Sequence, residues 1–351
     1  MSAARGHRMS KLTHSTVPLA LAAALALFAL PAAAATPKYG PQLEGFEYPH
    51  EVKRFALTSQ GQPLSMGYMD VAPTAAANGR TVVLLHGKNF CGATWESAIA
   101  ALAADGYRVV VPDQIGFCTS SKPEGYQFSF DQLATNTRAL LDSLGVERAT
   151  VIGHSMGGML AARYALNHSQ MVEQLVLVNP IGLEDWRAEG VPYATIDTLF
   201  ENELKTDYER IKDYQRKYYY SGQWQPRYDR WVSMLAGMYA GPGGRAVARN
   251  QAQTSEMLFT QPVVHEFDRI QTPTLLLIGQ KDRTAPGANR APPEIAKRLG
   301  DYPALGKRAA KRIPNATLVE FAELGHSPQV EAPERFNEAL LRGLGALGPA
   351  D

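Results

Sequence analysis

The chain has 351 residues, of which 45% are hydrophobic and 20% charged, and its formal net charge is +1. This composition is that of an ordinary globular protein with enough apolar material for a large core. The first 34 residues contribute three of the positive charges and no acid, so the rest of the chain carries −2. A nearly neutral protein offers no electrostatic basis for binding nucleic acid or an anionic membrane surface.

The first 35 residues have the order of a secretory signal. Basic residues precede an apolar run over 17–30, and a proline and four alanines follow at 31–35. A membrane span needs about 20 apolar residues, so this run is better suited to a signal cleaved near Ala35 than to an anchor. No later segment is apolar enough to span a bilayer. We therefore expect a periplasmic or secreted protein, with an uncleaved anchor as the alternative.

The pattern after the signal is a lead-in, a hairpin and then an α/β alternation. Residues 36–50 read as an extended lead-in, and 53–58 with 64–71 as the hairpin. We then expect strands over 81–85, 108–111, 149–152, 174–178, 274–278 and 317–321, and helices over 93–104, 130–144, 156–167, 292–299 and 333–344. Strands made of uninterrupted Val, Ile and Leu predict a mostly parallel sheet with helices on both faces.

This alternation stops between the strands that end at residue 178 and begin at residue 274. Residues 182–267 are rich in Tyr, Trp, Arg, Asp and Gln and lack strand-like runs. A structureless crossover of more than 80 residues would be unusual, so we interpret this segment as an inserted helical cap. The core then comprises 36–181 and 268–351.

Ser155 carries the strongest functional signal. It stands in the run Gly-His-Ser-Met-Gly-Gly at 153–158, between an apolar strand and a helix. Glycines two residues before and after the serine relieve the crowding of a tight turn, which lifts the hydroxyl above the sheet. This context predicts a nucleophile.

A serine nucleophile needs a base, and the base needs a carboxylate. Asp282 and His326 follow the last two predicted strands, where a parallel sheet would place both near Ser155. The chain order Ser, Asp, His is that of the nucleophile-elbow enzymes. An acid from the preceding loop, Glu184 or Asp185, is the alternative.

Backbone amides are expected to stabilise the oxyanion of a tetrahedral intermediate. One donor should be Met156, the first residue of the helix, and the other Lys88, with its neighbour Asn89 also possible. Gly87 would allow the backbone to approach closely. His154, within the elbow, is expected to pack structurally.

The two cysteines, Cys91 and Cys118, are too few for a disulfide-built scaffold. They lie in loops after two strands that we expect to be neighbours. Export to an oxidising compartment favours a bridge beside the active site, and two free thiols are the alternative.

The sequence resembles the α/β-hydrolase fold superfamily over about residues 50–346, specifically its members with a helical lid. The motifs that carry the resemblance are His86-Gly87, Asp113 with Gly116-Phe117, the run at 153–158, Gly279 with Asp282, and Gly325-His326. By this resemblance Ser155, Asp282 and His326 form the triad. Some relatives have an aspartate at the nucleophile position, and Ser155 argues instead for acyl chemistry. The loop at 88–91 lacks the Gly-Gly or Pro of several subfamilies, so the resemblance implies no particular substrate.

These features predict an exported serine hydrolase that cleaves a carboxylic ester or related acyl bond in a small, apolar substrate. The scattered histidines and the absence of a Cys-x-x-Cys pair give no spacing for a metal site, and no cofactor is expected. Alternatives are an aminopeptidase that holds a free amino terminus with Glu201, Glu203 or Asp207, a carbon–carbon bond hydrolase or lactonase, and, least favoured, a non-enzymatic binding protein. The sequence does not indicate an oligomeric state.

Overall fold

The computed structural model covers residues 1–351 and describes all of them except 5, 8, 10, 13–35 and 349–351. The expected signal, with its apolar run, lies largely outside the described residues. The chain divides into two units, Met1–Ala35 and Thr36–Asp351, and the second contains all the helices and strands of the described residues. None of the described helices has the length and apolar character required to cross a membrane.

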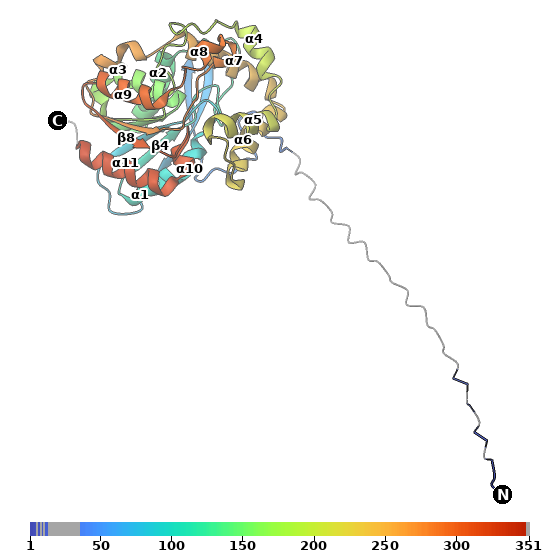
Figure 1. Ribbon diagram of the computed structural model, residues 1–351. Helices are drawn as coiled ribbons and strands as arrows, with labels where there is room; N and C mark the ends of the chain where they lie inside the picture. The colour runs from blue at the N-terminus through green and yellow to red at the C-terminus, as the bar shows by residue number, and fades with distance from the viewer. Residues whose placement is uncertain (5, 8, 10, 13–35, 349–351) are drawn as a thin grey trace. The chain divides into compact units, whose positions relative to one another are not determined.

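A mostly parallel eight-stranded sheet forms the centre of the second unit (Figure 1). Its strand order is β1-β2-β4-β3-β5-β6-β7-β8; β2 runs antiparallel to both β1 and β4, and all other neighbours are parallel. The strands are β1 Lys53–Ser59, β2 Gln62–Val71, β3 Thr81–Leu85, β4 Arg108–Pro112, β5 Ala149–His154, β6 Val172–Val178, β7 Thr274–Gly279 and β8 Ala316–Phe321. This architecture confirms the predicted α/β-hydrolase fold class.

Helices cover both faces of the sheet because its central strands are apolar on both sides. In β3, Val82 and Leu84 belong to one buried cluster, whereas Val83 and Leu85 belong to the other. The first cluster includes side chains of α1 and α11, and the second includes side chains of α2, α3 and α9. These helices are α1 Glu96–Ala104, α2 Phe130–Ser143, α3 Met156–Asn167, α9 Tyr302–Arg312 and α11 Pro333–Leu347.

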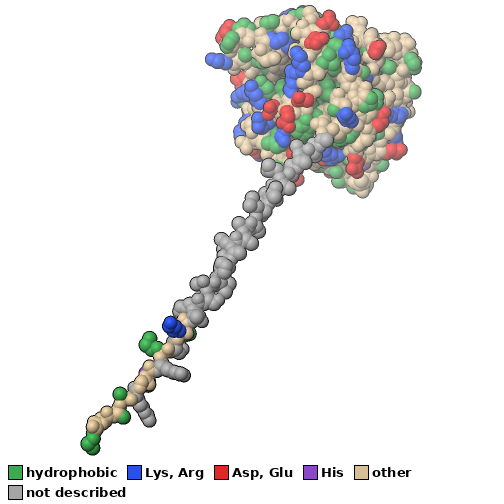
Figure 2. Space-filling model, turned by 90° about the vertical axis from the view of Figure 1, so that its right-hand side faces the viewer, with side chains coloured by type: hydrophobic (Ala, Val, Ile, Leu, Met, Phe, Trp, Pro, Cys, Tyr) green, Lys and Arg blue, Asp and Glu red, His purple; other side chains and the backbone are tan. Residues whose placement is uncertain are grey.

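The chain between β6 and β7 is largely helical, as expected for 182–267. Its principal elements are α4 Ile196–Glu203, α5 Tyr208–Tyr214, the π-helix η3 Gln215–Tyr219, α6 Asp229–Ala240 and α7 Gly244–Thr260. Helices α4 to α7 gather on one side of the body in Figure 1, and α7 packs along α4. Figure 2 views this side and shows acidic and basic side chains interspersed, in keeping with the near-zero net charge.

Two parts of the fold differ from the sequence expectations. The helix expected within 292–299 is a single turn, α8 (Pro293–Ala296), whereas α9 was not predicted. The apolar stripe of α9 is short and interrupted by Gly306, where an added Cβ would lie 3.3 Å from Ile278 of β7. The glycine that weakens the helical pattern therefore allows α9 to pack closely on the sheet.

The lead-in at 36–50 is also more than an extended strap. It forms turns, and Leu43 is buried with 2% exposure. The Tyr39 backbone N–H donates to the Gly237 carbonyl oxygen of α6 over 3.0 Å. A Cβ on Gly237 would lie 2.3 Å from the Tyr39 ring, so this glycine makes room for the lead-in against the cap.

Candidate active site

Ser155 lies on a strained turn between β5 and α3. Its backbone angles are φ 57° and ψ −121°, an unfavourable combination for a residue with a side chain. A Cβ on Gly153 would lie 2.0 Å from the Gly157 carbonyl oxygen, and one on Gly157 would lie 2.2 Å from the Leu85 carbonyl oxygen. Both positions therefore require glycine, and the turn they permit holds the hydroxyl at the carboxyl end of β5.

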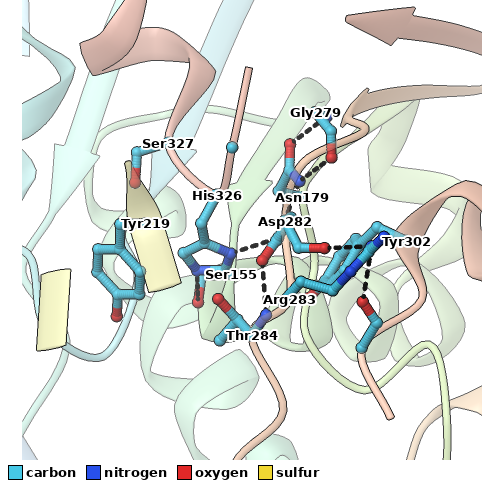
Figure 3. A network of polar contacts seen from close by, with 12 residues as sticks. Ser155, Asn179, Tyr219, Gly279, Asp282, Arg283, Thr284, Tyr302, His326 and Ser327 are labelled. Carbon is cyan, nitrogen blue, oxygen red and sulfur yellow. Dashed lines mark hydrogen bonds and ion pairs between the residues drawn. The ribbon is translucent and has the colours of Figure 1, made fainter. Parts of the chain in front are cut away.

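The structure brings together the three side chains expected to form a triad (Figure 3). The Ser155 hydroxyl lies 2.9 Å from Nε2 of His326, and Nδ1 of His326 lies 2.6 Å from Oδ2 of Asp282. His326 and Asp282 have 0% exposure and Ser155 has 5%. Because an ionised carboxylate only accepts hydrogen bonds, Nδ1–H donates to Asp282 and Nε2 is left to accept the serine proton.

Asn179 and Thr284 complete the surroundings of Asp282. The Asn179 side-chain N–H donates to Oδ2 of Asp282 over 2.9 Å, and the Thr284 backbone N–H donates to Oδ1 over 2.7 Å. Asn179 also accepts the Gly279 N–H over 2.8 Å. Sequence reasoning missed Asn179, although an Asn-Pro pair directly after a buried strand was a visible signal. Its positive φ of 35° suits Asn better than most other residues.

The alternative acids are engaged elsewhere. Glu184 accepts the Gly300 N–H over 2.9 Å, and Asp185 lies 2.8 Å from Nε2 of His265. Asp282 is therefore the carboxylate that contacts His326.

Glu331 and Tyr219 hold the loop around His326. The Glu331 carboxylate accepts the backbone N–H groups of Gly325 over 2.9 Å and Ser327 over 3.2 Å, on either side of the histidine. The backbone N–H of His326 donates to the Tyr219 carbonyl oxygen over 2.9 Å, and the centroids of the Tyr219 ring and the imidazole are 4.5 Å apart. Burial raises the pKa of Glu331 to about 7, against the opposing effect of these hydrogen bonds. The cap, through Tyr219, therefore contacts the loop of His326 directly.

The two expected oxyanion donors belong to segments that lie beside the serine. Met156 begins α3, where the first N–H groups have no partner within the helix. A Cβ on Gly87 would lie 3.0 Å from that of Ser155, and Lys88, the next residue, lines the same cavity as Ser155. Donation by Met156 and Lys88 to an oxyanion stays a prediction.

His154 and His86 have structural partners. Nε2 of His154 donates to the His326 carbonyl oxygen over 2.8 Å, as its expected structural role requires. Nε2 of His86 accepts the Gln114 N–H over 3.0 Å, which leaves Nδ1 to donate to the Gly87 carbonyl oxygen. Burial lowers the pKa of both imidazoles, so both are neutral near pH 7.

Cys91 and Cys118 form a disulfide that joins the loop after β3 to the loop after β4. The neighbouring Asp113 accepts the Gly92 N–H over 2.7 Å and the Thr119 hydroxyl over 2.6 Å. In the described part of the chain, the two cysteines and Asp113 form the only cluster of potential metal ligands. Because the sulfur atoms are bonded to each other, this donor set does not fit a metal ion.

A cavity of about 290 Å³ lies between Ser155 and the cap. Its apolar walls include Ile181, Leu199, Ile211, Leu235, Leu258 and Phe259. The volume is at the lower end of the range for small-molecule sites. The cavity therefore suits a small substrate with apolar portions.

An ion pair in the wall of this cavity joins the core to the cap. Nζ of Lys88 lies 3.1 Å from Oε1 of Glu203, and the Tyr239 hydroxyl donates to Oε2 of Glu203 over 2.5 Å. The adjacent Asn89 donates to the Tyr219 hydroxyl over 2.8 Å. These contacts tie the expected oxyanion loop to the cap.

Comparison with known proteins identifies the family of this chain. The model of the alpha/beta hydrolase fold family matches residues 80–333. The chain belongs to this family. A solved structure of a probable hydrolytic enzyme from Pseudomonas aeruginosa is 62% identical, covers 88% of this chain and 99% of its own, and superposes with a TM-score of 0.87.

Two curated relatives are more distant. A 2-hydroxy-6-oxononadienedioate/2-hydroxy-6-oxononatrienedioate hydrolase of Paraburkholderia phymatum is 29% identical over 89% of this chain and 96% of its own. The putative carbamate hydrolase RutD of Stutzerimonas stutzeri is 29% identical over 74% and 90%. The protein is thus a hydrolase. Its relatives are named for different substrates.

Replacing Glu331 should change how stability depends on pH. The pKa of Glu331 is raised from 4.5 to about 7, so the folded protein binds the carboxyl proton more tightly than the unfolded chain does. This proton stabilises the fold fully below about pH 4.5, and the contribution is lost as the pH rises through 7. Relative to Glu331→Gln, the wild type should lose up to about 3 kcal/mol of unfolding free energy between these limits. Urea unfolding at pH 4.5 and 8 measures this, with exposed Glu334→Gln as the control. A wild-type-minus-variant difference that is equal at both pH values would contradict the assignment.

Reducing the disulfide should destabilise the protein. Because Cys91 and Cys118 are 27 residues apart, opening the loop should lower the unfolding free energy by about 3 kcal/mol. Denaturant unfolding of oxidised and reduced protein measures the change. The double variant Cys91→Ala/Cys118→Ala is the control, because reductant should not affect its stability. Two free thiols in protein purified without reductant would refute the bridge.

Proposed function

We propose that this hydrolase is a serine esterase-like enzyme that cleaves a carboxylic ester or related acyl bond through an acyl-enzyme on Ser155. The contact that carries the proposal is the buried chain of hydrogen bonds from Ser155 through His326 to Asp282, with lengths of 2.9 and 2.6 Å. These distances suit proton transfer from the hydroxyl to the imidazole.

The proposed reaction has two stages. Oγ of Ser155 attacks the carbonyl carbon while its proton passes to Nε2 of His326, and Asp282 stabilises the resulting imidazolium. Backbone N–H groups of Met156 and Lys88 hold the oxyanion. The leaving group takes the proton from His326 as its bond to carbon breaks. A water molecule then gives a proton to His326 and attacks the acyl carbon. The bond from this carbon to Oγ breaks as His326 returns the proton to Ser155, which releases the acid and restores the enzyme.

The acids of the cap argue against an aminopeptidase. Glu203 lines the cavity, but its carboxylate is already paired with Lys88 and Tyr239. Asp207 accepts the Arg210 N–H at the start of α5, and Glu201 is exposed. None is a free carboxylate placed to receive an amino terminus. A panel of aminoacyl-nitroanilides and nitrophenyl esters separates the two activities, and we expect turnover of the esters only.

A carbon–carbon bond hydrolase or lactonase is the second candidate. It is favoured by the relative from Paraburkholderia phymatum, which is named as a 2-hydroxy-6-oxononadienedioate/2-hydroxy-6-oxononatrienedioate hydrolase and matches over 89% of this chain. Such enzymes also require an activated nucleophile and an oxyanion site, so lactones and vinylogous diketo acids belong in the substrate panel.

We further propose that the protein is exported. The order of basic residues, apolar run and alanines at 1–35 supports export, and the disulfide suits an oxidising compartment. The mature protein should begin near Thr36 and be recovered from the periplasm or medium. Intact-mass analysis of each fraction measures this; a full-length cytoplasmic product would contradict it.

Ser155→Ala should abolish ester hydrolysis, because no other group in the site offers a nucleophile with a paired base. We expect kcat/KM for nitrophenyl acetate to octanoate to fall by at least about 10³-fold, with one chain length preferred by the wild type. A fluorophosphonate probe should label the wild type but not the variant. Failure of the probe to label folded wild-type protein would instead support a non-enzymatic binding role.

A further inference from the structure

The wall of the cavity contains a buried amide with no partner. Gln215 lines the cavity with 0% exposure, and neither Oε1 nor Nε2 of its side chain has a hydrogen-bond partner. The Thr284 hydroxyl, also in the wall, is buried and unpartnered. Within the described part of the chain, several buried polar side-chain atoms lack a hydrogen-bond partner. Of the residues that carry them, only Gln215 and Thr284 line the cavity.

Several other polar side chains of the wall are already paired. Lys88 contacts Glu203, which also accepts from Tyr239, and Asn89 donates to Tyr219. An unpaired buried polar group costs about 1–3 kcal/mol, and such groups are rare without a reason. A ligand that hydrogen-bonds to Gln215 would remove this cost, whereas it would have to break existing bonds to use the paired groups.

The position of Gln215 links it to the catalytic residues. It is the first residue of the π-helix η3, and Tyr219, which contacts His326 through both its ring and its carbonyl oxygen, is the last. Irregular π-helical turns often occur at functional sites. Thr284 belongs to the polar network around Asp282 drawn in Figure 3, and Thr284 and Ser155 line the same cavity.

We infer that Gln215 and Thr284 form a polar subsite that selects an acyl substrate carrying a neutral amide group, an inference that rests on the proposed esterase-like function. A carboxamide offers both a donor and an acceptor, so it can pair with Nε2 and Oε1 of Gln215 together. A carboxylate would leave Oε1 without a donor, and an ammonium group would leave Nε2 without an acceptor. The Thr284 hydroxyl can accept or donate one further bond.

The test compares two series of nitrophenyl esters. One series ends in a carboxamide and the other in an isopropyl group of nearly the same shape, each with four to seven methylene groups between the terminus and the ester. The ratio of kcat/KM for the two termini measures selection at the subsite and cancels changes that affect both series. We expect the wild type to favour the amide at one spacer length by at least about tenfold.

Variants assign this preference to residues. Gln215→Leu should reduce the ratio about tenfold or more, and Thr284→Val, which keeps the backbone N–H that holds Asp282, should reduce it less. Gln251→Leu makes the same chemical change at a glutamine of α7 that is 2% exposed but does not line the cavity, and should retain the wild-type ratio. If Gln215→Leu does not fold, Gln215→Met replaces it with an unbranched side chain of similar length.

The outcomes separate this inference from the proposed function. Hydrolysis of both series without an amide preference, or the same ratio in the Gln215 and Gln251 variants, overturns the subsite alone. Fluorophosphonate labelling of Ser155 without hydrolysis of any ester of the carboxamide-terminated series also overturns only the subsite. Hydrolysis of neither series by folded protein that the probe does not label overturns the esterase-like function and the subsite with it.

Discussion

The carboxylate of Asp282 is fully buried, and the site depends on the hydrogen bonds that replace its water. A buried carboxylate is costly unless donors surround it. His326, Asn179 and the Thr284 backbone supply these donors from the ends of β8, β6 and β7. The register of the three parallel strands, with Val178 opposite Leu277 and Gly279 opposite Phe321, places their ends side by side. Sheet pairing therefore brings the loops that carry these three donors to one carboxylate.

The cap contributes to the site as well as covering it. Tyr219 accepts the His326 N–H and packs against its ring, and Glu203 pairs with Lys88 of the oxyanion loop. The disulfide and Asp113 hold that loop from the other side. A substrate that alters the cap would thus act on groups that contact both the base and the expected oxyanion donors.

The aromatic content of the cap has two uses. Tyr220 stacks on Tyr228 with ring centroids 3.9 Å apart, and Trp224 packs edge-on against Tyr228. These rings build the interior of the cap, whereas Tyr214 and Tyr219 line the cavity. Because charged, amide and hydroxyl groups share the cavity wall with aliphatic side chains, the pocket is more polar than the aromatic sequence of the cap suggested.

The sequence by itself determined the strand–helix alternation, the helical insertion and the turn on which Ser155 lies. Uninterrupted apolar strands, amphipathic helices and the spacing of Gly153 and Gly157 are local properties of the sequence. The turn at Ser155 requires glycine at both of these positions. Sequence order also indicated Asp282 and His326, because parallel strands bring their carboxyl ends to one edge of a sheet. Helix α9 escaped prediction because its apolar stripe is short and is interrupted by Gly306.

Only the tertiary structure decided which polar groups have partners. Glu203 was a free acid in the sequence but is neutralised by Lys88, 115 residues away. Asn179 was an ordinary residue of a turn but holds Asp282, and Gln215 was one of many cap glutamines but lies unpaired in the cavity wall. Hydrogen bonds and ion pairs depend on separations of about 3 Å between atoms, and contacts between distant segments are fixed only when the whole chain packs.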